Sequence, residues 1–243
     1  MVEATNPQSP CVSFLKERES DCLHCAIRAS ALFAELGKSD LDQRLKTIHN
    51  GVVPAETAIY RSGDPAEAVF TIRSGMVKLV GAAAVPSPRI VRLLGPGAAI
   101  GLEAATGGSY EHDAVAMRDV NLCRIPRSAL LSLGQQHPGV QTGLVNKWRE
   151  HALLADRWIS TICNGKQKAR ATALVRLLIE ISRDPWDAVR LPRTADMAAV
   201  LGCSAEGISR QMARLKRQGL LKRVAPRTFW CDPALTADLV DRA

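Results

Sequence analysis

Residues 200–220 read VLGCSAEGISRQMARLKRQGL, which is the end of one helix, a glycine turn and a second, basic amphipathic helix. Ser204 is a candidate N-cap for the second helix, because a serine hydroxyl can accept a hydrogen bond from a free backbone N–H of the first turn. Apolar residues at spacings of four and three predict one buried stripe: Ile208, Met212 and Leu215. The opposite face carries Glu206, Ser209, Arg210, Ala213 and Arg217. This pattern predicts a helix-turn-helix whose second helix reads DNA.

The surrounding residues agree with this interpretation. The helix before the turn is expected to run from Thr194, a candidate N-cap, to Gly202. Residues 200–231 contain seven Lys or Arg, Arg214 among them, against one acid, Glu206, so this segment supplies +6 of the chain's formal net charge of +8. Cations beside a reading helix can contact phosphates, which favours DNA binding over a plain helical hairpin.

The overall composition limits the class of protein. A chain of 243 residues is long enough for about two domains. No apolar run approaches the ~20 residues that span a bilayer, and the N-terminus lacks a secretory signal pattern. We therefore expect a cytoplasmic protein with no membrane partner. Seven cysteines, an odd number, favour metal or redox chemistry over a disulfide scaffold.

The region from about residue 52 to 125 consists of short β-type runs broken by Gly, Pro and Asp, at 58–64, 69–75, 76–80 and 89–94. Many short strands with glycine turns predict a barrel or jelly roll. The glycine-rich run 95–108 fits either a loop over a ligand pocket or a tight corner of the roll.

A long helix is predicted from about residue 140 to 163, with a length of roughly 36 Å. Its apolar residues alternate steps of three and four: Val145, Trp148, Ala152, Ala155, Ile159 and Ile162. Such a stripe fits a helix packed on its own core or a dimer seam, and the length favours a dimerisation helix. After Asn164-Gly165 another helix is expected, from Lys168 to Asp184. Further on, residues 219–224 and 227–231 flank Ala225-Pro226 and predict a β-hairpin, the wing of a winged helix.

This order of elements resembles the superfamily of the cyclic-AMP receptor protein and the fumarate-nitrate-reduction regulator (CRP/FNR). The markers are Gly63-Asp64, Phe70-Thr-Ile72 with Gly75, Leu94 to Gly97, Cys123-Arg-Ile-Pro126, Met197-Ala198 through Gly219, and Glu206-x-x-Ser209-Arg210. The resemblance implies an α+β protein with an N-terminal jelly-roll domain of the cyclic-nucleotide-binding type, a long dimerisation helix and a C-terminal winged helix-turn-helix. The expected segments are a cysteine-bearing segment at 1–30, the β-roll at 31–137, the dimerisation helix at 138–164 and the DNA-binding domain at 165–243.

Within the superfamily, the loop 106–116 argues against a cyclic nucleotide. Members that bind one place an arginine here for its phosphate, whereas this chain offers Glu111 and Asp113. A cyclic phosphate would meet repulsion, so no cyclic nucleotide is expected.

The cysteines resemble those of the FNR branch. Cys22-Leu-His-Cys25 looks like its N-terminal cluster-binding segment, and Cys123 looks like its distant ligand in the roll. The family's third N-terminal cysteine is missing after Cys25, but Cys11 lies upstream and a ten-residue loop can return it to the pair. The resemblance therefore implies an iron–sulfur cluster, [4Fe–4S] in type, on Cys11, Cys22, Cys25 and Cys123. Unligated thiols or a zinc clip that includes His24 are the alternatives. Cys163, Cys203 and Cys231 are expected to be buried or incidental thiols.

The expected function is that of an oxygen- or redox-responsive transcription regulator and not of an enzyme. Glu206 can accept from a cytosine amino group, Arg210 can bond a guanine edge and Ser209 can contact a further base. In the family this trio reads TTGAT-like half-sites in an inverted repeat, which implies double-stranded DNA, a homodimer and RNA polymerase as partners. Asp156 would oppose dimerisation when the cluster is lost.

Other functions stay open at this point. A regulator of the same family could sense haem, nitric oxide or thiol oxidation without a cluster. A metal- or small-molecule-binding module without regulatory DNA binding is an alternative of another class, which the basic reading helix disfavours. A redox enzyme is disfavoured because no nucleotide-binding glycine loop, nucleophile elbow or HExxH motif is found.

Overall fold

The computed structural model describes residues 14, 18–19, 25–34, 47–81, 89–182 and 188–235. The chain divides into two compact units, residues 1–152 and 153–243. None of the helices in these described ranges has both the length and the apolar character needed to cross a membrane.

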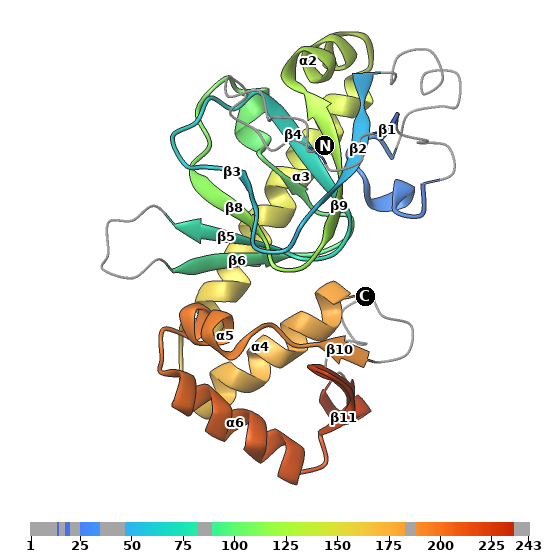
Figure 1. Cartoon of the computed structure of the whole chain (residues 1–243). Coiled ribbons are helices and arrows are strands. Elements are labelled where there is room, and N and C mark those ends of the chain that lie inside the picture. Colours follow the sequence, from blue (N-terminus) through green and yellow to red (C-terminus); the bar gives the residue numbers. More distant parts are fainter. Residues whose placement is uncertain are drawn as a thin grey trace, which may run out of the picture. The chain divides into compact units, whose positions relative to one another are not determined.

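The first unit is built on two antiparallel sheets (Figure 1). One sheet has the strand order β1-β2-β9-β4-β7 and the other β3-β8-β5-β6. The strands are β1 (Arg18–Glu19), β2 (His49–Val53), β3 (Ala58–Tyr60), β4 (Ala68–Ser74), β5 (Val77–Gly81), β6 (Ile90–Leu94), β7 (Ala99–Ile100), β8 (His112–Ala116) and β9 (Val120–Pro126). Two short 3-10 helices, η1 (Arg28–Ser30) and η3 (Leu102–Ala105), accompany them.

Strand β9 lies between β2 and β4, and its register places Cys123 opposite Asn50 on one side and Thr71 on the other. Tyr110 is buried in the core of the roll. Its hydroxyl donates to the carbonyl of Ala68 at 2.8 Å and accepts from the Ala68 N–H at 3.2 Å. The Tyr110 ring stacks on Tyr60 with ring centroids 3.8 Å apart. Distant strands are therefore joined at one buried side chain.

Helix α2 (Arg127–Gln136) follows β9 directly, and α3 (Pro138–Arg157) follows α2. The boundary between the two units falls within α3. The long helix predicted from about 140 to 163 is present as α3 together with the π-helical turn η4 (Trp158–Ile162). Gly165 then adopts a φ of 90°, a left-handed conformation that ends the helical path.

The second unit contains α4 (Gln167–Ser182), α5 (Thr194–Leu201) and α6 (Ala205–Arg217) with a sheet of order β10-β12-β11. Strand β10 is Ala188–Arg190, and β11 (Leu221–Ala225) and β12 (Thr228–Cys231) form the predicted hairpin, which the 3-10 turn η5 (Pro233–Leu235) follows. The winged helix-turn-helix is thus confirmed, and with it the α+β class and the β-roll.

One predicted helix boundary is wrong. Thr194 is the first helical residue of α5, and Arg193 is its N-cap. The reason is that the carbonyl of Arg193 already accepts the first helical hydrogen bond, from Met197 N–H at 3.0 Å. No side-chain cap bond is made at this helix start.

Candidate DNA-binding surface and sensor pocket

The position of α6 is determined by local contacts that the sequence predicts. Gly202 adopts a left-handed φ of 56° and ends α5, and the Ser204 Oγ accepts from Gly207 N–H at 3.1 Å. Ile208, Met212 and Leu215 are buried, with exposed fractions of 0%, 6% and 1%. The N-cap and the buried stripe of this helix are therefore confirmed.

The opposite face of α6 presents Glu206, Ser209, Arg210 and Arg217 to solvent. The pKa of Glu206 is lowered by hydrogen bonds from its own backbone N–H and from the Ser204 hydroxyl, with a smaller contribution from the charge of Arg210. An ionised carboxylate acceptor and a guanidinium donor therefore stand on one turn of one helix. Such a pair can bond the polar edges of bases in a major groove.

Arg214, predicted as a DNA contact, lies differently. It is half-buried, and its Nη2 lies 3.5 Å from the Oγ1 of Thr172 on α4. Its Nε is buried and has no hydrogen-bond partner among the described residues. The structure thus places Arg214 at the contact between α6 and α4, away from the exposed face.

The wing adds cations beside α6. Ser209, Lys216, Arg223 and Arg227 line one cleft between α6 and the hairpin. Lys216 Nζ lies 4.7 Å from the centroid of the Phe229 ring, a cation–π distance. These cations can contact the phosphates on either side of a base-reading helix.

Two of the four predicted cluster cysteines meet in one pocket of the first unit. Cys25 and Cys123 both line it, together with Arg28 and Thr71. The rest of the lining is apolar: Ile27, Ala31, Phe33, Ile48 and Ile125. Cys123 is 9% exposed and Cys25 is half-buried. Cys11, Cys22 and the alternative ligand His24 lie outside the described residues.

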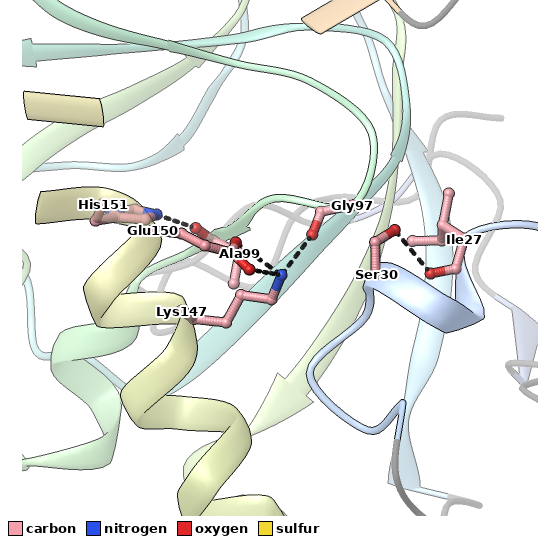
Figure 2. A network of polar contacts seen from close by, with 7 residues as sticks. All are labelled: Ile27, Ser30, Gly97, Ala99, Lys147, Glu150 and His151. Carbon is pink, nitrogen blue, oxygen red and sulfur yellow. Dashed lines mark hydrogen bonds and ion pairs between the residues drawn. The ribbon is translucent and has the colours of Figure 1, made fainter. Parts of the chain in front are cut away.

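The fold explains how these two cysteines come together. Alternate residues of a strand point to the same face, so Cys123 and Ile125 of β9 face the pocket together. The segment 25–34 supplies the facing wall, and its turn is held by Ser30 Oγ, which donates to the carbonyl of Ile27 at 3.1 Å (Figure 2).

A second feature of this unit joins α3 to the roll and was missed by the sequence analysis. Lys147, 6% exposed, donates to the carbonyl of Gly97 at 3.3 Å and to both carboxylate oxygens of Glu150 (Figure 2). His151 Nε2 lies 2.8 Å from the carbonyl of Ala99, and its Nδ1 lies 3.0 Å from Arg92 Nη1. The only sequence signal was a charged pair at i and i+3 in a helix, which is common on solvated faces.

The ring of His151 is neutral near pH 7. Burial, and then the charge of Arg92, lower its pKa to about 4. In the neutral ring Nε2–H donates to Ala99, and Nδ1 accepts from Arg92.

The roll also gathers Glu103, Glu111 and His112, whose potential ligand atoms all lie within 4.8 Å of one another. Burial lowers the pKa of Arg92, while the charges of Glu103 and Glu111 act to raise it. Burial and the charge of Arg92 lower the pKa of His112, which is half-buried. The structure therefore sets a cation, Arg92, near the predicted acidic loop.

The second predicted acid of that loop has another partner. Asp113 Oδ1 accepts from the Ser62 N–H at 2.8 Å. This carboxylate therefore holds the loop in place.

The predicted dimerisation residues fall into two groups. Val145, Trp148 and Ile159 are large apolar side chains with exposed fractions of 65%, 42% and 64%. Ala152 and Asp156 are also exposed, and Ala155 is half-buried. Ile162 is 1% exposed, so its assignment to a dimer interface is wrong. A π-helical turn holds more residues than an α-helical one, so the spacing of three and four that is valid along α3 does not extend through η4.

Comparison with known proteins gives a consistent result for both units. Residues 51–137 match the family model of the cyclic nucleotide-binding domain, and residues 172–234 match that of the Crp-like helix-turn-helix domain. The cyclic AMP receptor protein of Thermus thermophilus is 28% identical over 204 residues, which cover 83% of this chain and 92% of that protein. The transcriptional activator protein anr of Pseudomonas aeruginosa is 24% identical and is covered to 85%, with 84% of this chain.

A solved structure, FixK2 from Bradyrhizobium japonicum, has the same fold, with a TM-score of 0.70 at 22% identity over 80% of this chain and 97% of that one. A roll of the cyclic nucleotide-binding type and a Crp-like helix-turn-helix thus occur in one chain. The chain is therefore a member of the CRP/FNR family of DNA-binding transcription regulators.

Proposed function

We propose that this regulator responds to oxygen or another oxidant through an iron–sulfur cluster, [4Fe–4S] in type, held by Cys11, Cys22, Cys25 and Cys123. The observation that carries the proposal is that Cys25 and Cys123, far apart in the sequence, line the same pocket. Cysteine thiolates are the usual ligands of such clusters. The roll and the N-terminal segment each contribute one thiol to that pocket.

The other residues of the pocket fit such a group. Its largely apolar lining limits the access of water, and Arg28 places a positive charge at the pocket that would offset the negative charge of a thiolate-ligated cluster. When bound, the cluster would supply an oxidant-sensitive link between the N-terminal segment and the roll. The chain's own residues would hold the cluster through these thiols. Strand β9, which carries Cys123, continues directly into α2 and α3.

The proposed active form is a homodimer that binds double-stranded DNA. The exposed apolar side chains Val145, Trp148 and Ile159 support a second copy as partner, because large apolar groups are rarely left exposed in number. Asp156, exposed on the same helix, would oppose the close approach of two subunits when the cluster is absent. By analogy with the family, the DNA-bound dimer would contact RNA polymerase.

On DNA, Glu206, Ser209 and Arg210 of each subunit would read one TTGAT-like half-site. The dimer axis would arrange two such half-sites as an inverted repeat, about one helical turn apart. Ser204, just before this trio, and Arg217, about two turns beyond Arg210 on the same helix, are assigned to the phosphates that flank it, as are the wing cations. We assign no cyclic nucleotide to the roll, because Glu103 and Glu111 stand beside Arg92 and would repel a phosphate.

The cluster is tested by anaerobic purification of the full chain, with iron and acid-labile sulfide measured per subunit. Wild-type protein should be coloured and contain both, and Cys123→Ser should lose most of the iron. Cys163→Ser is the matched control, since Cys163 is exposed and outside the pocket lining. Colourless, iron-free wild-type protein would overturn the cluster, and full iron in Cys11→Ser would require a different fourth ligand.

The DNA assignment is tested by titrating an inverted repeat of TTGAT with the anaerobic protein. Arg210→Ala should weaken binding by about 10- to 100-fold, because a bidentate base contact is worth about 1–3 kcal/mol, and should relax the preference for guanine. Arg61→Ala, an exposed arginine of the roll, should bind as wild type does. Equal losses on specific and random DNA would contradict base reading by Arg210.

The role of Asp156 is tested by sedimentation of protein prepared in air. Asp156→Ala should shift the air-treated protein from monomer toward dimer, because a charge that opposes association is removed. An unchanged monomer–dimer ratio would exclude Asp156 from the switch.

A further inference from the structure

A cluster of metal-ligand side chains stands outside the cysteine pocket. Glu103 belongs to η3, Glu111 directly precedes β8, and His112 is the first residue of β8. Their potential ligand atoms, two carboxylate oxygens and an imidazole nitrogen, all lie within 4.8 Å of one another. Residues from two separate elements therefore converge on one point.

The backbone around the cluster is held on both sides. Tyr110, next to Glu111, is anchored through its hydroxyl to Ala68 and through its N–H to the carbonyl of Asp64 at 2.9 Å. The Ser62 hydroxyl donates to the carbonyl of Glu111 at 3.2 Å. On the other side, η3 begins after Gly101, whose φ of 72° turns the chain into the helix. The ligands are thus carried by a braced loop, which reduces the entropy lost on binding an ion.

The donor set and its spacing suit a first-row divalent metal. Such ions bind carboxylate oxygen and imidazole nitrogen at about 2.0–2.2 Å, so opposite ligands stand about 4 Å apart. A cluster spanning 4.8 Å reaches that geometry through small rotations of side chains. Glu111 is exposed and the other two are half-buried, which leaves room for water in the remaining coordination positions.

The charge of the cluster favours a cation over an anion. Two carboxylates face one guanidinium, that of Arg92, and Arg92 also bonds His151 on α3. The single positive charge of Arg92 therefore balances only one of the two negative charges of Glu103 and Glu111. The positive charge of Arg92 also repels an incoming cation and therefore weakens its binding.

We propose that Glu103, Glu111 and His112 form a binding site for a divalent transition-metal ion, separate from the cysteine pocket and independent of any cluster bound there. The site occupies the part of the roll from which the acidic loop excludes a cyclic phosphate. Arg92 is a positioning residue beside it and not a ligand.

The test uses the full-length protein, stripped of metal with a chelator and titrated separately with Mn²⁺ and Zn²⁺. Mn²⁺ is followed by electron paramagnetic resonance because carboxylate and imidazole suit it, whereas thiolates select softer metals. Zn²⁺ is followed by calorimetry. The expected result is one ion of at least one metal per subunit, bound equally by a variant that lacks Cys25 and Cys123.

Variants separate metal binding from a structural role. Glu103→Gln and His112→Gln should each weaken the affinity by about tenfold or more. Arg92→Gln should tighten it, because a repelling charge is removed, and a purely structural loss would not produce that gain. Glu67→Gln, an exposed glutamate of the same unit, is the control and should bind as wild type does.

Two results would overturn the proposal. The first is the absence of stoichiometric binding of both metals to the wild-type protein, which would leave an ionic cluster with Arg92 only. The second is unchanged affinity in Glu103→Gln and His112→Gln, with circular dichroism confirming that both variants are folded. Loss of the iron–sulfur cluster in the separate test above would leave this site untouched.

Discussion

The reading face of α6 and the sites of the β-roll are built in opposite ways. On α6, the N-cap, the buried stripe and the exposed polar face all lie between Ser204 and Arg217, so one helical repeat places them. In the roll, Cys25 and Cys123 line one pocket because segments far apart in the chain pack together, and Glu103 lies near His112 because the chain turns back between η3 and β8. The comparison shows that a surface carried by one helix is encoded locally, whereas the proposed sites of the roll depend on the tertiary fold.

The largest expected effect concerns the packing that positions α6. Ile208→Ala should lower the free energy of unfolding of the second unit by about 2–5 kcal/mol, because a fully buried side chain leaves a cavity. Urea unfolding and hydrogen exchange of the α6 peptides measure this. Val224→Ala on the wing, where Val224 is 61% exposed, should change stability by less than about 0.5 kcal/mol. Equal effects of the two substitutions would contradict the buried stripe.

The next effect tests the tertiary contact between α3 and the roll. The folded-state pKa of His151, about 4, lies below the ordinary value of 6.5, so the folded state binds fewer protons. The stability that the neutral, buried His151 ring contributes to the folded state is fully present above pH 6.5. As the pH falls from 6.5 toward 4, this ring lowers the free energy of unfolding by up to about 3 kcal/mol. The groups that face the ring are Arg92, Lys147 and Glu150.

This dependence is measured as unfolding free energy between pH 7 and pH 4. His151→Gln should show a shallower decline, because glutamine can donate to Ala99 without titrating. Ser132→Ala, an exposed change on α2 that involves no titratable group, should keep the wild-type slope. A His151→Gln slope as steep as that of the wild type would mean that other groups cause the decline.

A smaller effect is expected within the core of the roll. Tyr110→Phe removes the hydroxyl that pairs both backbone groups of Ala68, and leaves them buried without that partner. The loss should be about 1–3 kcal/mol in the first unit, with the ring stacking on Tyr60 retained. Denaturant unfolding measures it, and a change below about 0.5 kcal/mol would show that water replaces the hydroxyl.

The smallest effect is expected at the cap of the reading helix. Ser204→Ala should destabilise α6 by about 1 kcal/mol, because Gly207 N–H loses its acceptor. Faster hydrogen exchange in the first turn of α6 would report this. Ser209→Ala, exposed on the same helix, should leave that exchange unchanged and alter only DNA binding. Parallel changes in both variants would mean that the cap and the reading face are not separable.

Prediction from the sequence succeeded for features set by neighbouring residues and failed for features set by the tertiary fold. The reading helix, the hairpin and the glycine turn at Gly202 were predicted because their determinants are close neighbours in the chain. The interface residue Ile162 was misplaced because a π-helical turn changes the helical period, which no pattern of apolar residues announces. Arg92, Lys147 and His151 were missed because nothing in their neighbourhood distinguishes them from solvated charges.

By itself, the sequence determined the order of domains, the amphipathic helix with its exposed polar face and the side chains available to the proposed sites, since these depend on local periodicity, capping and residue identity. The tertiary structure decided which of those residues share a site. It placed Cys25 and Cys123 at one pocket, turned the chain back between η3 and β8 so that Glu103 lies near Glu111 and His112, and buried His151 against the roll. The physical reason is that proximity between distant residues depends on strand register and packing, which involve the whole unit.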